Sequence, residues 1–362
     1  MERRHIFNAG PSALPFEVLD KAQSELISYQ QAGMSVMEFS HRSKEYKSIH
    51  TEAQNLLREL LEIPDEYEVL FLQGGASLQF SMVPMNFLGN KQVGNYVVTG
   101  SWSEKAYKEA QKIGAASIAA STKESNFDHI PDLSELRYSD NDAYLHLTSN
   151  NTIHGTQWRN FPANQNQTLI ADMSSDILSR VIPVQNFSLI YAGAQKNLGP
   201  AGVTVVILKN DILERIPEGL PTMLDYKTHV QKKSLYNTPP AFAIYMLSLV
   251  LKWTKENGGI ENFEAENKKK STMLYETIDN SNGFYNGHAK KDSRSRMNVT
   301  FTLPTEELTQ LFLEEATEEG FVGLKGHRSL GGCRASIYNA VPLDSVEALC
   351  EFMSQFHQKH NL

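Results

Sequence analysis

Two side chains that follow apolar runs have the chemistry to serve a cofactor that carries amino groups. Asp172 ends the run 168–172, and Lys196 follows the uncharged run 189–195, 24 residues further along the chain than Asp172. A lysine at a partly desolvated strand end can form a Schiff base, and a carboxylate can keep a pyridinium nitrogen protonated. The spacing fits one crossover of a parallel sheet. Taken alone, Asp172 is as readily a helix cap and Lys196 a surface residue.

Two further segments offer an anion site and an aromatic ring to the same region. The run 68–73 leads into Gly74 to Ser77 and an apolar helix, whose free N–H groups and dipole favour an anion. This turn matches neither the dinucleotide nor the Walker fingerprint, so alone it is weak evidence. Trp102 follows another strand candidate, where it could stack on a planar ring, and Thr152 follows a third. A core or loop position explains Trp102 equally well.

The chain is acidic, yet it places cations in two short motifs. Its formal net charge is −8, which argues against a general binder of nucleic acid or anionic membranes and permits a local anion site. His-Arg-Ser occurs at 41–43 and again at 327–329, followed by Arg334. Arginine binds carboxylates and phosphates through two parallel hydrogen bonds. Both segments are therefore candidates to bind an anionic substrate, although a solvated surface arginine needs no function.

The elements that must position these residues indicate an α/β fold. Several strand candidates are apolar on successive residues, which is typical of a parallel sheet covered on both faces. The candidates are 68–73, 95–100, 143–148, 168–172, 189–194 and 203–208. Beyond residue 258 the pattern changes to an alternating strand over 296–303 and amphipathic helices. We predict an extended segment over 1–15, a large domain over 16–258 and a small α+β domain over 259–362.

The composition also bounds the environment of the protein. The two cysteines, Cys333 and Cys350, form neither a disulfide framework nor a metal site by themselves, which favours a reducing compartment. The longest apolar run, 241–253, is too short to span a bilayer and is typical of a buried helix. The N-terminus lacks the apolar run of a signal peptide. We predict a cytoplasmic protein without a metal site.

Beyond these residue-by-residue readings, the motifs resemble those of a known family over essentially the whole chain. This is the fold-type I, class V family of pyridoxal-phosphate-dependent aminotransferases, and within it the branch that acts on phosphoserine. The motifs are FNAGPSALP, FSHRS, LQGGAS, GSW, NNTIHGTQ, ADMSSD, YAGAQKNLGPAG, YNTPP and GHRSLGGCRASIYNA. The resemblance implies a mostly parallel seven-stranded sheet covered by helices, a smaller α+β C-terminal domain, and an N-terminal segment that packs against it.

For the cofactor, pyridoxal 5′-phosphate, the resemblance implies one role per residue. Lys196 would form the Schiff base and move the proton, Asp172 would pair with the pyridine nitrogen, and Trp102 would stack on the ring. Thr152 would lie beside the phenolic oxygen. The residues that would hold the phosphate, with Gly75 allowing close approach, are Gly75, Ala76, Ser77, Ser174 and Gln195.

For the substrates, the resemblance implies reversible amino transfer between O-phospho-L-serine and 2-oxoglutarate, by a ping-pong mechanism in serine biosynthesis. Use of the phosphorylated hydroxythreonine of vitamin B6 synthesis stays open. Arg334 would bind the α-carboxylate. Asn237 and Thr238 would complete the phosphate site of the neighbouring subunit, so a homodimer is expected. The distal phosphate or carboxylate would be bound by His41, Arg42, His327 and Arg328, and which pair does so, and from which subunit, stays open.

Other functions on the same fold need features that the sequence offers poorly. A desulfurase needs a reactive cysteine near the cofactor, and Cys333 is the one candidate. A dehydrogenase needs the glycine fingerprint, which is missing. A cofactor-binding protein without catalysis remains an alternative.

Overall fold

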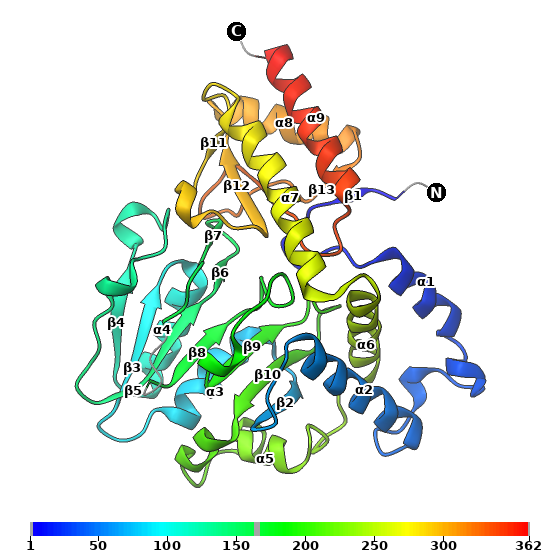
Figure 1. Ribbon diagram of the computed structural model, residues 1–362, viewed down its shortest axis with the longest axis vertical. Coiled ribbons are helices and arrows are strands. Elements are labelled where there is room, and N and C mark those ends of the chain that lie inside the picture. The colour runs from blue at the N-terminus through cyan, green and yellow to red at the C-terminus, as the bar shows by residue number, and fades with distance from the viewer. Residues whose placement is uncertain (1–2, 163–166, 361–362) are drawn as a thin grey trace.

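The computed structural model describes residues 3–162 and 167–360 of the chain (Figure 1). Its larger part is built around one seven-stranded sheet. The strand order is β2 (Tyr67–Leu72), β10 (Thr204–Lys209), β9 (Leu189–Gly193), β8 (Leu169–Asp172), β5 (Asp142–Thr148), β3 (Val93–Val98) and β4 (Ala116–Ser121). All neighbours pair in parallel except β10, which is antiparallel to both β9 and β2. The predicted mostly parallel, seven-stranded sheet is therefore confirmed.

The strands form where apolar residues follow one another, and all six predicted strands lie in this sheet. The sequence did not predict the seventh strand, β4, because its run ASIAAS is mostly alanine and serine, which favour strands weakly. Strand β4 lies at the sheet edge, where its Ile118 is exposed. An edge strand of this kind needs no continuous apolar run, so the sequence lacked the pattern that marks the buried strands. Strand β10 turns back because the connection 194–203 is too short for the helical crossover that parallel pairing needs.

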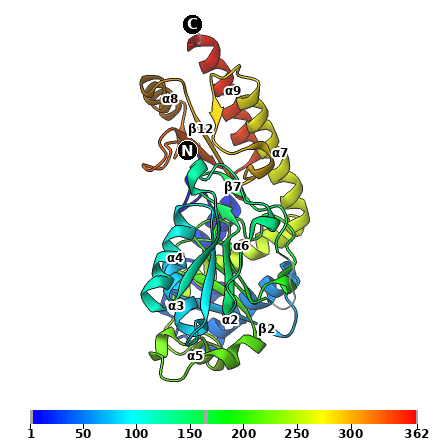
Figure 2. The same cartoon turned by 90° about the vertical axis from the view of Figure 1, so that its left-hand side faces the viewer.

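Helices cover both faces of the sheet, so each face has its own apolar core. On one face lie α2 (Lys44–Leu60) and α6 (Ala241–Glu256); on the other lie α3 (Gly75–Phe87), α4 (Ser101–Ile113) and α5 (Tyr226–Gln231). Figure 2 shows α3 and α4 together on the left of the sheet. Helix α6 is apolar nearly all round because α1 (Phe16–Glu25) and α2 cover its outer side. Among the helices that the structure describes, none is long and apolar enough to cross a membrane.

The smaller part consists of an antiparallel sheet with three helices against it. Its strands are β11 (Asn286–Gly287), β12 (Asn298–Thr302) and β14 (Cys333–Ser336). Its helices are α7 (Gly259–Asp279), α8 (Glu306–Glu318) and α9 (Leu343–His360). Strand β1 (His5–Ile6) pairs with β13 (Phe321–Val322), so the N-terminal segment lies against this part. Its core is made mostly of Phe, Leu and Val side chains from the three helices, from strands β12, β13 and β14 and from the loops between them.

Helix α7 links the two parts, and in Figure 1 it runs from the large part into the small one. The predicted boundary at residues 258 and 259 falls between α6 and α7. This boundary and the other domain limits stay predictions. The carboxyl ends of β5, β8 and β9 meet at one edge of the sheet, where Thr148 lies beside Asp172 and Asp172 beside Tyr191. The short strands β6 (Asn150–Asn151) and β7 (Thr156–Gln157) follow β5 at the same edge.

Candidate active site

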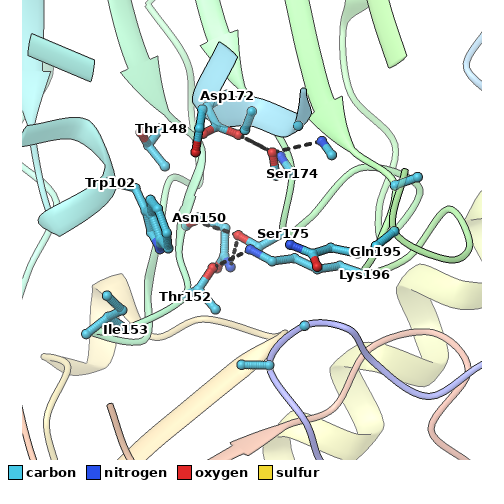
Figure 3. A pocket seen from close by; sticks show the side chains of 18 of the residues that line it. Trp102, Thr148, Asn150, Thr152, Ile153, Asp172, Ser174, Ser175, Gln195 and Lys196 are labelled. Carbon is cyan, nitrogen blue, oxygen red and sulfur yellow. Dashed lines mark hydrogen bonds between the residues drawn. The ribbon is translucent and has the colours of Figure 1, made fainter. Parts of the chain in front are cut away.

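A cavity of about 430 Å³ lies at this edge of the sheet, and the small part supplies its remaining wall. Figure 3 shows the side chains that line it. The structure brings together eleven of the residues predicted from the sequence: Gly75, Ala76, Ser77, Trp102, Thr152, Asp172, Ser174, Gln195, Lys196, His327 and Arg334. They come from segments up to about 260 residues apart in the chain, so the fold and not local sequence assembles the site.

Lys196 extends from the loop after β9 into the cavity (Figure 3). Its Nζ donates a hydrogen bond of 2.8 Å to Thr152 Oγ1. Burial lowers the pKa of Lys196 to about 8; Asp172 opposes this shift and the positive charge of Arg334 adds to it. A larger fraction of the amine is therefore neutral near neutral pH than for an ordinary lysine, which is what a nucleophile and proton acceptor requires.

Asp172 ends β8 with its side chain almost fully buried. Its Oδ1 accepts hydrogen bonds from the Ser174 backbone N–H at 2.9 Å and from Ser174 Oγ at 2.6 Å. Burial raises the pKa of Asp172, while Ser174 and Lys196 act in the opposite direction. A buried carboxylate of this kind is stabilised by a cationic partner, and a protonated ring nitrogen supplies one.

Ser174 therefore has two partners within the protein. Its Oγ donates to Asp172 and accepts a bond of 3.1 Å from the Gly193 N–H. These contacts orient the Asp172 carboxylate toward the cavity (Figure 3). The role in phosphate binding that the sequence suggested for Ser174 stays a prediction.

The start of α3 supplies the anion site expected from the Gly-Gly turn. Gly74 and Gly75 have φ angles of +88° and +65°, a backbone region that favours glycine. No heavy atom lies within 4 Å of where a Cβ on Gly75 would be, so the N-terminus of α3 stays open. The helix has 13 residues, and its first N–H groups at Ala76 and Ser77 line the cavity. Such a helix start binds a phosphate group readily.

Trp102 lies in the first turn of α4 and forms another wall of the cavity (Figure 3). Its ring is partly exposed, as a stacking surface must be. Lys105 Nζ lies 4.0 Å from the centroid of this ring, within the range of a cation–π contact. This lysine was not predicted as part of the site.

Three polar residues that line the cavity were not assigned to the site from the sequence: Thr148, Asn150 and Ser175. Thr148 Oγ1 is buried and has no hydrogen-bond partner in the part of the chain that the structure describes. Asn150 Nδ2 donates to Ser175 Oγ and to Asn298 Oδ1, both at 2.8 Å, and so ties this wall to the small part. Their position at the end of an apolar strand was the available signal, because the carboxyl ends of parallel strands face the ligand site.

Arg334 enters the cavity from β14 of the small part and is 9% exposed. Its Nη1 donates to the Thr152 carbonyl oxygen at 3.3 Å, and burial lowers its pKa. Its Nε is buried without a hydrogen-bond partner, and no salt bridge joins it to a carboxylate within residues 3–162 and 167–360. A buried guanidinium in this state requires an anion, because an uncompensated charge and donor are costly.

The other predicted substrate residues are placed differently. His327 lines the cavity, and burial lowers its pKa, with Arg334, Arg328 and Lys105 adding to the effect. The other three predicted substrate residues and the two residues predicted for the neighbouring phosphate site are partly or fully exposed and lie outside the cavity lining: His41, Arg42, Arg328, Asn237 and Thr238. His41 Nδ1 lies 3.3 Å from Thr238 Oγ1, so the two segments predicted to serve the neighbouring subunit are in contact.

Comparison with known proteins identifies the class to which this fold and site belong. The family model described as aminotransferase class-V matches residues 4–349. The chain therefore belongs to the class-V aminotransferases, as the resemblance implied.

Several similar proteins within that family share the name phosphoserine aminotransferase. Phosphoserine aminotransferase from Geobacillus kaustophilus (strain HTA426) is 65% identical over 359 residues, which cover 99% of each chain. A solved structure that describes radiation damage of the Schiff base in phosphoserine aminotransferase has a TM-score of 0.98 at 61% identity, and covers 99% of this chain and 100% of that one. A PLP-bound phosphoserine aminotransferase from Trichomonas vaginalis has a TM-score of 0.93 at 38% identity, and covers 97% of this chain and 100% of its own.

Proposed function

We propose that this protein is a phosphoserine aminotransferase that uses pyridoxal 5′-phosphate to move an amino group between O-phospho-L-serine and 2-oxoglutarate. One observation carries the proposal: the Lys196 amine and the unpaired Arg334 guanidinium line the same buried cavity. An amine beside a carboxylate-binding cation is the minimum that amino transfer between α-amino acids needs. The full-length similarity to proteins named phosphoserine aminotransferase supports the substrate.

The cavity residues fit the proposed cofactor. The open start of α3 suits its phosphate, Asp172 suits its ring nitrogen, and the partly exposed Trp102 ring suits a stacked pyridine. Thr148 Oγ1 is an orphaned polar atom at the same wall and has room for a ligand partner. When bound there, pyridoxal phosphate supplies an electron sink for the bonds at the substrate α-carbon.

The chain supplies positioning and proton transfer. Arg334 binds the α-carboxylate, which both substrates share, and so holds the α-carbon near Lys196. The Lys196 amine accepts the α-proton and returns it one step later, and its lowered pKa suits both transfers near neutral pH. Thr152 holds Nζ by a 2.8 Å hydrogen bond while the amine is free. Because one site serves both substrates in turn, ping-pong kinetics follow.

Selection of the phosphorylated substrate requires cations where the substrate phosphate would lie. We call this region, at the opposite end of the substrate from the α-carboxylate, the far end of the cavity. His327 lines the cavity and is the candidate for this role, and the exposed Arg328 follows it in the same loop. We infer that His41 and Arg42 reach the same end from a second subunit, together with Asn237 and Thr238. The contact between His41 and Thr238 supports this arrangement, because it places both segments on one surface of the chain.

A homodimer is the assembly that this surface favours. The segment before His41 exposes large apolar side chains, including Phe16, Ile27 and Met37, and Ile27 is 85% exposed. Several large exposed apolar side chains on one segment are more typical of an association surface than of a surface that stays in water. The predicted cytoplasmic location and the predicted pathway, serine biosynthesis, belong to the same proposal.

Turnover with phosphoserine and serine, measured side by side with 2-oxoglutarate, tests the substrate. We expect phosphoserine to react at least about 100-fold faster at equal low concentration, since a site built for an anion rejects the analogue that lacks it. Equal rates would refute the phosphate specificity. Release of sulfide from cysteine would instead indicate a desulfurase. The structure gives that alternative little support, because Cys333 is fully buried and burial raises its thiol pKa to about 12.

A further inference from the structure

A buried polar network joins helix α7 to the loop of the catalytic lysine. It begins with Lys270, whose side chain is 1% exposed. The Lys270 Nζ donates to the carbonyl oxygens of Tyr338 at 2.9 Å and Val341 at 3.0 Å. No salt bridge joins Lys270 to a carboxylate among the described residues. A buried amine that binds only two backbone carbonyls holds that backbone in place at a considerable desolvation cost.

One turn earlier on α7, Asn267 continues the network toward the large part. Its Nδ2 donates to Asn339 Oδ1 at 2.8 Å and to the Ser179 carbonyl at 3.1 Å. Asn339 in turn donates from Nδ2 to the Leu178 carbonyl at 2.9 Å. Both asparagines are buried, so these bonds are shielded from competition with water.

The network ends beside the catalytic amine. The backbone N–H of Asn339 donates to Asn197 Oδ1 at 3.0 Å, and Asn197 directly follows Lys196. Tyr338 donates from its hydroxyl to the Ala9 carbonyl at 2.9 Å and accepts from Asn298 Nδ2 at 3.1 Å. The segment 338–341 is thus fixed from α7, from the N-terminal segment and from the lysine loop.

The same segment follows β14, which carries Arg334. Three residues separate Arg334 from Tyr338, and the end of β14 is held to β12 by the pairing of Ser336 with Asn298. Arg334 belongs to the small part and Lys196 to the large part, so the distance between them is set by how the two parts pack. This distance therefore depends on whatever holds the segment 338–341 against the loop 195–197.

We propose that Lys270 and Asn339 are positioning residues that fix the separation between the Lys196 amine and the Arg334 guanidinium. The inference rests on the proposed function, in which Arg334 binds the carboxylate common to both substrates. Loosening the segment displaces that carboxylate relative to the amine, and a displacement of about 1 Å lowers rates by up to about 100-fold. His327 and Arg328 lie in the loop that leads into β14 and would shift together with Arg334. Both substrates carry a distal anion, so both should lose rate by a similar factor.

The test compares Lys270→Met with Lys269→Met in the cofactor-loaded enzyme. Lys269 is the neighbouring residue on α7 and is exposed, so its replacement is a matched control. We expect Lys270→Met to lower kcat/KM about 10- to 100-fold for both phosphoserine and glutamate, by the same factor. The pH midpoint of the visible cofactor band should also rise. The reason is that the positive charge of Arg334 lowers the pKa of the Lys196 nitrogen, and a displaced Arg334 does so less.

The second variant is Asn339→Ala, which removes the side chain that links α7 to residue 178 and decides the question if Lys270→Met does not fold. An unchanged midpoint together with unchanged kcat/KM would overturn the inference, even if the melting temperature changed. A loss confined to phosphoserine, or equal losses in Lys269→Met, would overturn it too. Because the midpoint is read without substrate, it tests the inference separately from substrate identity. A wild-type enzyme that does not use phosphoserine would refute only the proposed function.

Discussion

The cavity wall at the sheet edge and the exposed segments that carry Arg42 and Arg328 differ in how firmly the fold fixes their side chains. At the sheet edge, Asp172 and Lys196 are tied by hydrogen bonds to Ser174 and Thr152, and the neighbouring strands β5 and β9 fix the backbone of Asp172. In contrast, Arg42 and Arg328 are exposed and have no salt bridge to a carboxylate within residues 3–162 and 167–360. The groups at the sheet edge are therefore preorganised within one chain, whereas the exposed cations lack such fixed partners among the described residues.

This difference shows which part of the reaction each region serves. Bond breaking at the α-carbon is common to both substrates, and in the proposed mechanism it needs rigid placement of an amine, a carboxylate and Arg334. The far end must accept a phosphate in one half-reaction and a carboxylate in the other. Exposed cations on loops, including those that the proposed dimer would supply, can adapt to both. Variants in the two regions should therefore differ in size of effect and in substrate dependence.

The largest effect is expected for Lys196→Ala. Loss of the amine removes the nucleophile and the proton carrier together, so turnover with phosphoserine should fall by at least about 1,000-fold. Borohydride should no longer fix the cofactor to the protein, and the melting temperature should stay near that of the wild type. Substantial residual turnover would show that another amine does the chemistry.

Arg334→Ala should weaken both substrates equally, because both present an α-carboxylate. Hydrogen bonds to charged groups contribute about 1.5–3 kcal/mol, which corresponds to a loss of roughly 10- to 100-fold in kcat/KM. Steady-state kinetics with phosphoserine and with glutamate measure the two losses. A loss for only one substrate would move the shared carboxylate site elsewhere and would erase the distinction between the two regions.

A third effect concerns stability and its dependence on pH in the cofactor-free protein. The pKa of Lys196 is about 8 in the folded state and 10.5 in the unfolded chain, so the unfolded chain holds more protons between these values. The free energy of unfolding therefore rises with pH from about 8 to 10.5, and the destabilisation is complete below pH 8. Lys196→Met should be more stable than the wild type by roughly 3 kcal/mol at pH 7. Urea unfolding at pH 7 and pH 11 measures this gain, which should vanish at the higher pH.

Much of the fold was predictable because burial leaves a mark in the sequence. Six strands followed from apolar runs, and the strand ends pointed to Asp172 and Lys196. Strand β4 left no such mark, since its residues are small and its Ile118 is exposed. The roles of Arg334 and the His-Arg pairs came from family resemblance, because a cation in a loop has no periodicity that reveals its partner.

The network on α7 shows a different limit. Lys268, Lys269 and Lys270 form a charged run that is typical of a solvated helix face. Only the rotation of α7 against the segment 338–341 buries the third lysine and exposes the first two. Three adjacent identical residues therefore have different environments, and no local pattern distinguishes them.

Mixing an inactive subunit with a weakened one tests whether the exposed cations act across a dimer. Arg42→Ala should lower kcat/KM for phosphoserine about 10-fold or more, as expected for loss of a charged hydrogen bond. If Arg42 serves the neighbouring site, a dimer of Lys196→Ala and Arg42→Ala subunits has one intact site. Refolding the two variants together at equal amounts should then restore about a quarter of wild-type activity at low phosphoserine. Activity that stays at the average of the separate variants would place Arg42 in the site of its own chain.

The smallest effect is expected for Lys105→Met. Lys105 lies over Trp102 and close enough to His327 to lower its pKa, so its charge favours an anion at the far end of the cavity. Because the lysine is exposed, solvent screens this charge, and the loss in kcat/KM should be at most about 5-fold. The loss should appear with phosphoserine and be smaller with glutamate, whose distal group carries less charge. Lys108→Met is the control, since Lys108 lies on the same helix but pairs with Glu104 at 3.2 Å. Equal losses in both variants would show that only the overall charge of α4 matters. A loss as large as that of Arg334→Ala would mean that the far end is as rigidly organised as the sheet edge.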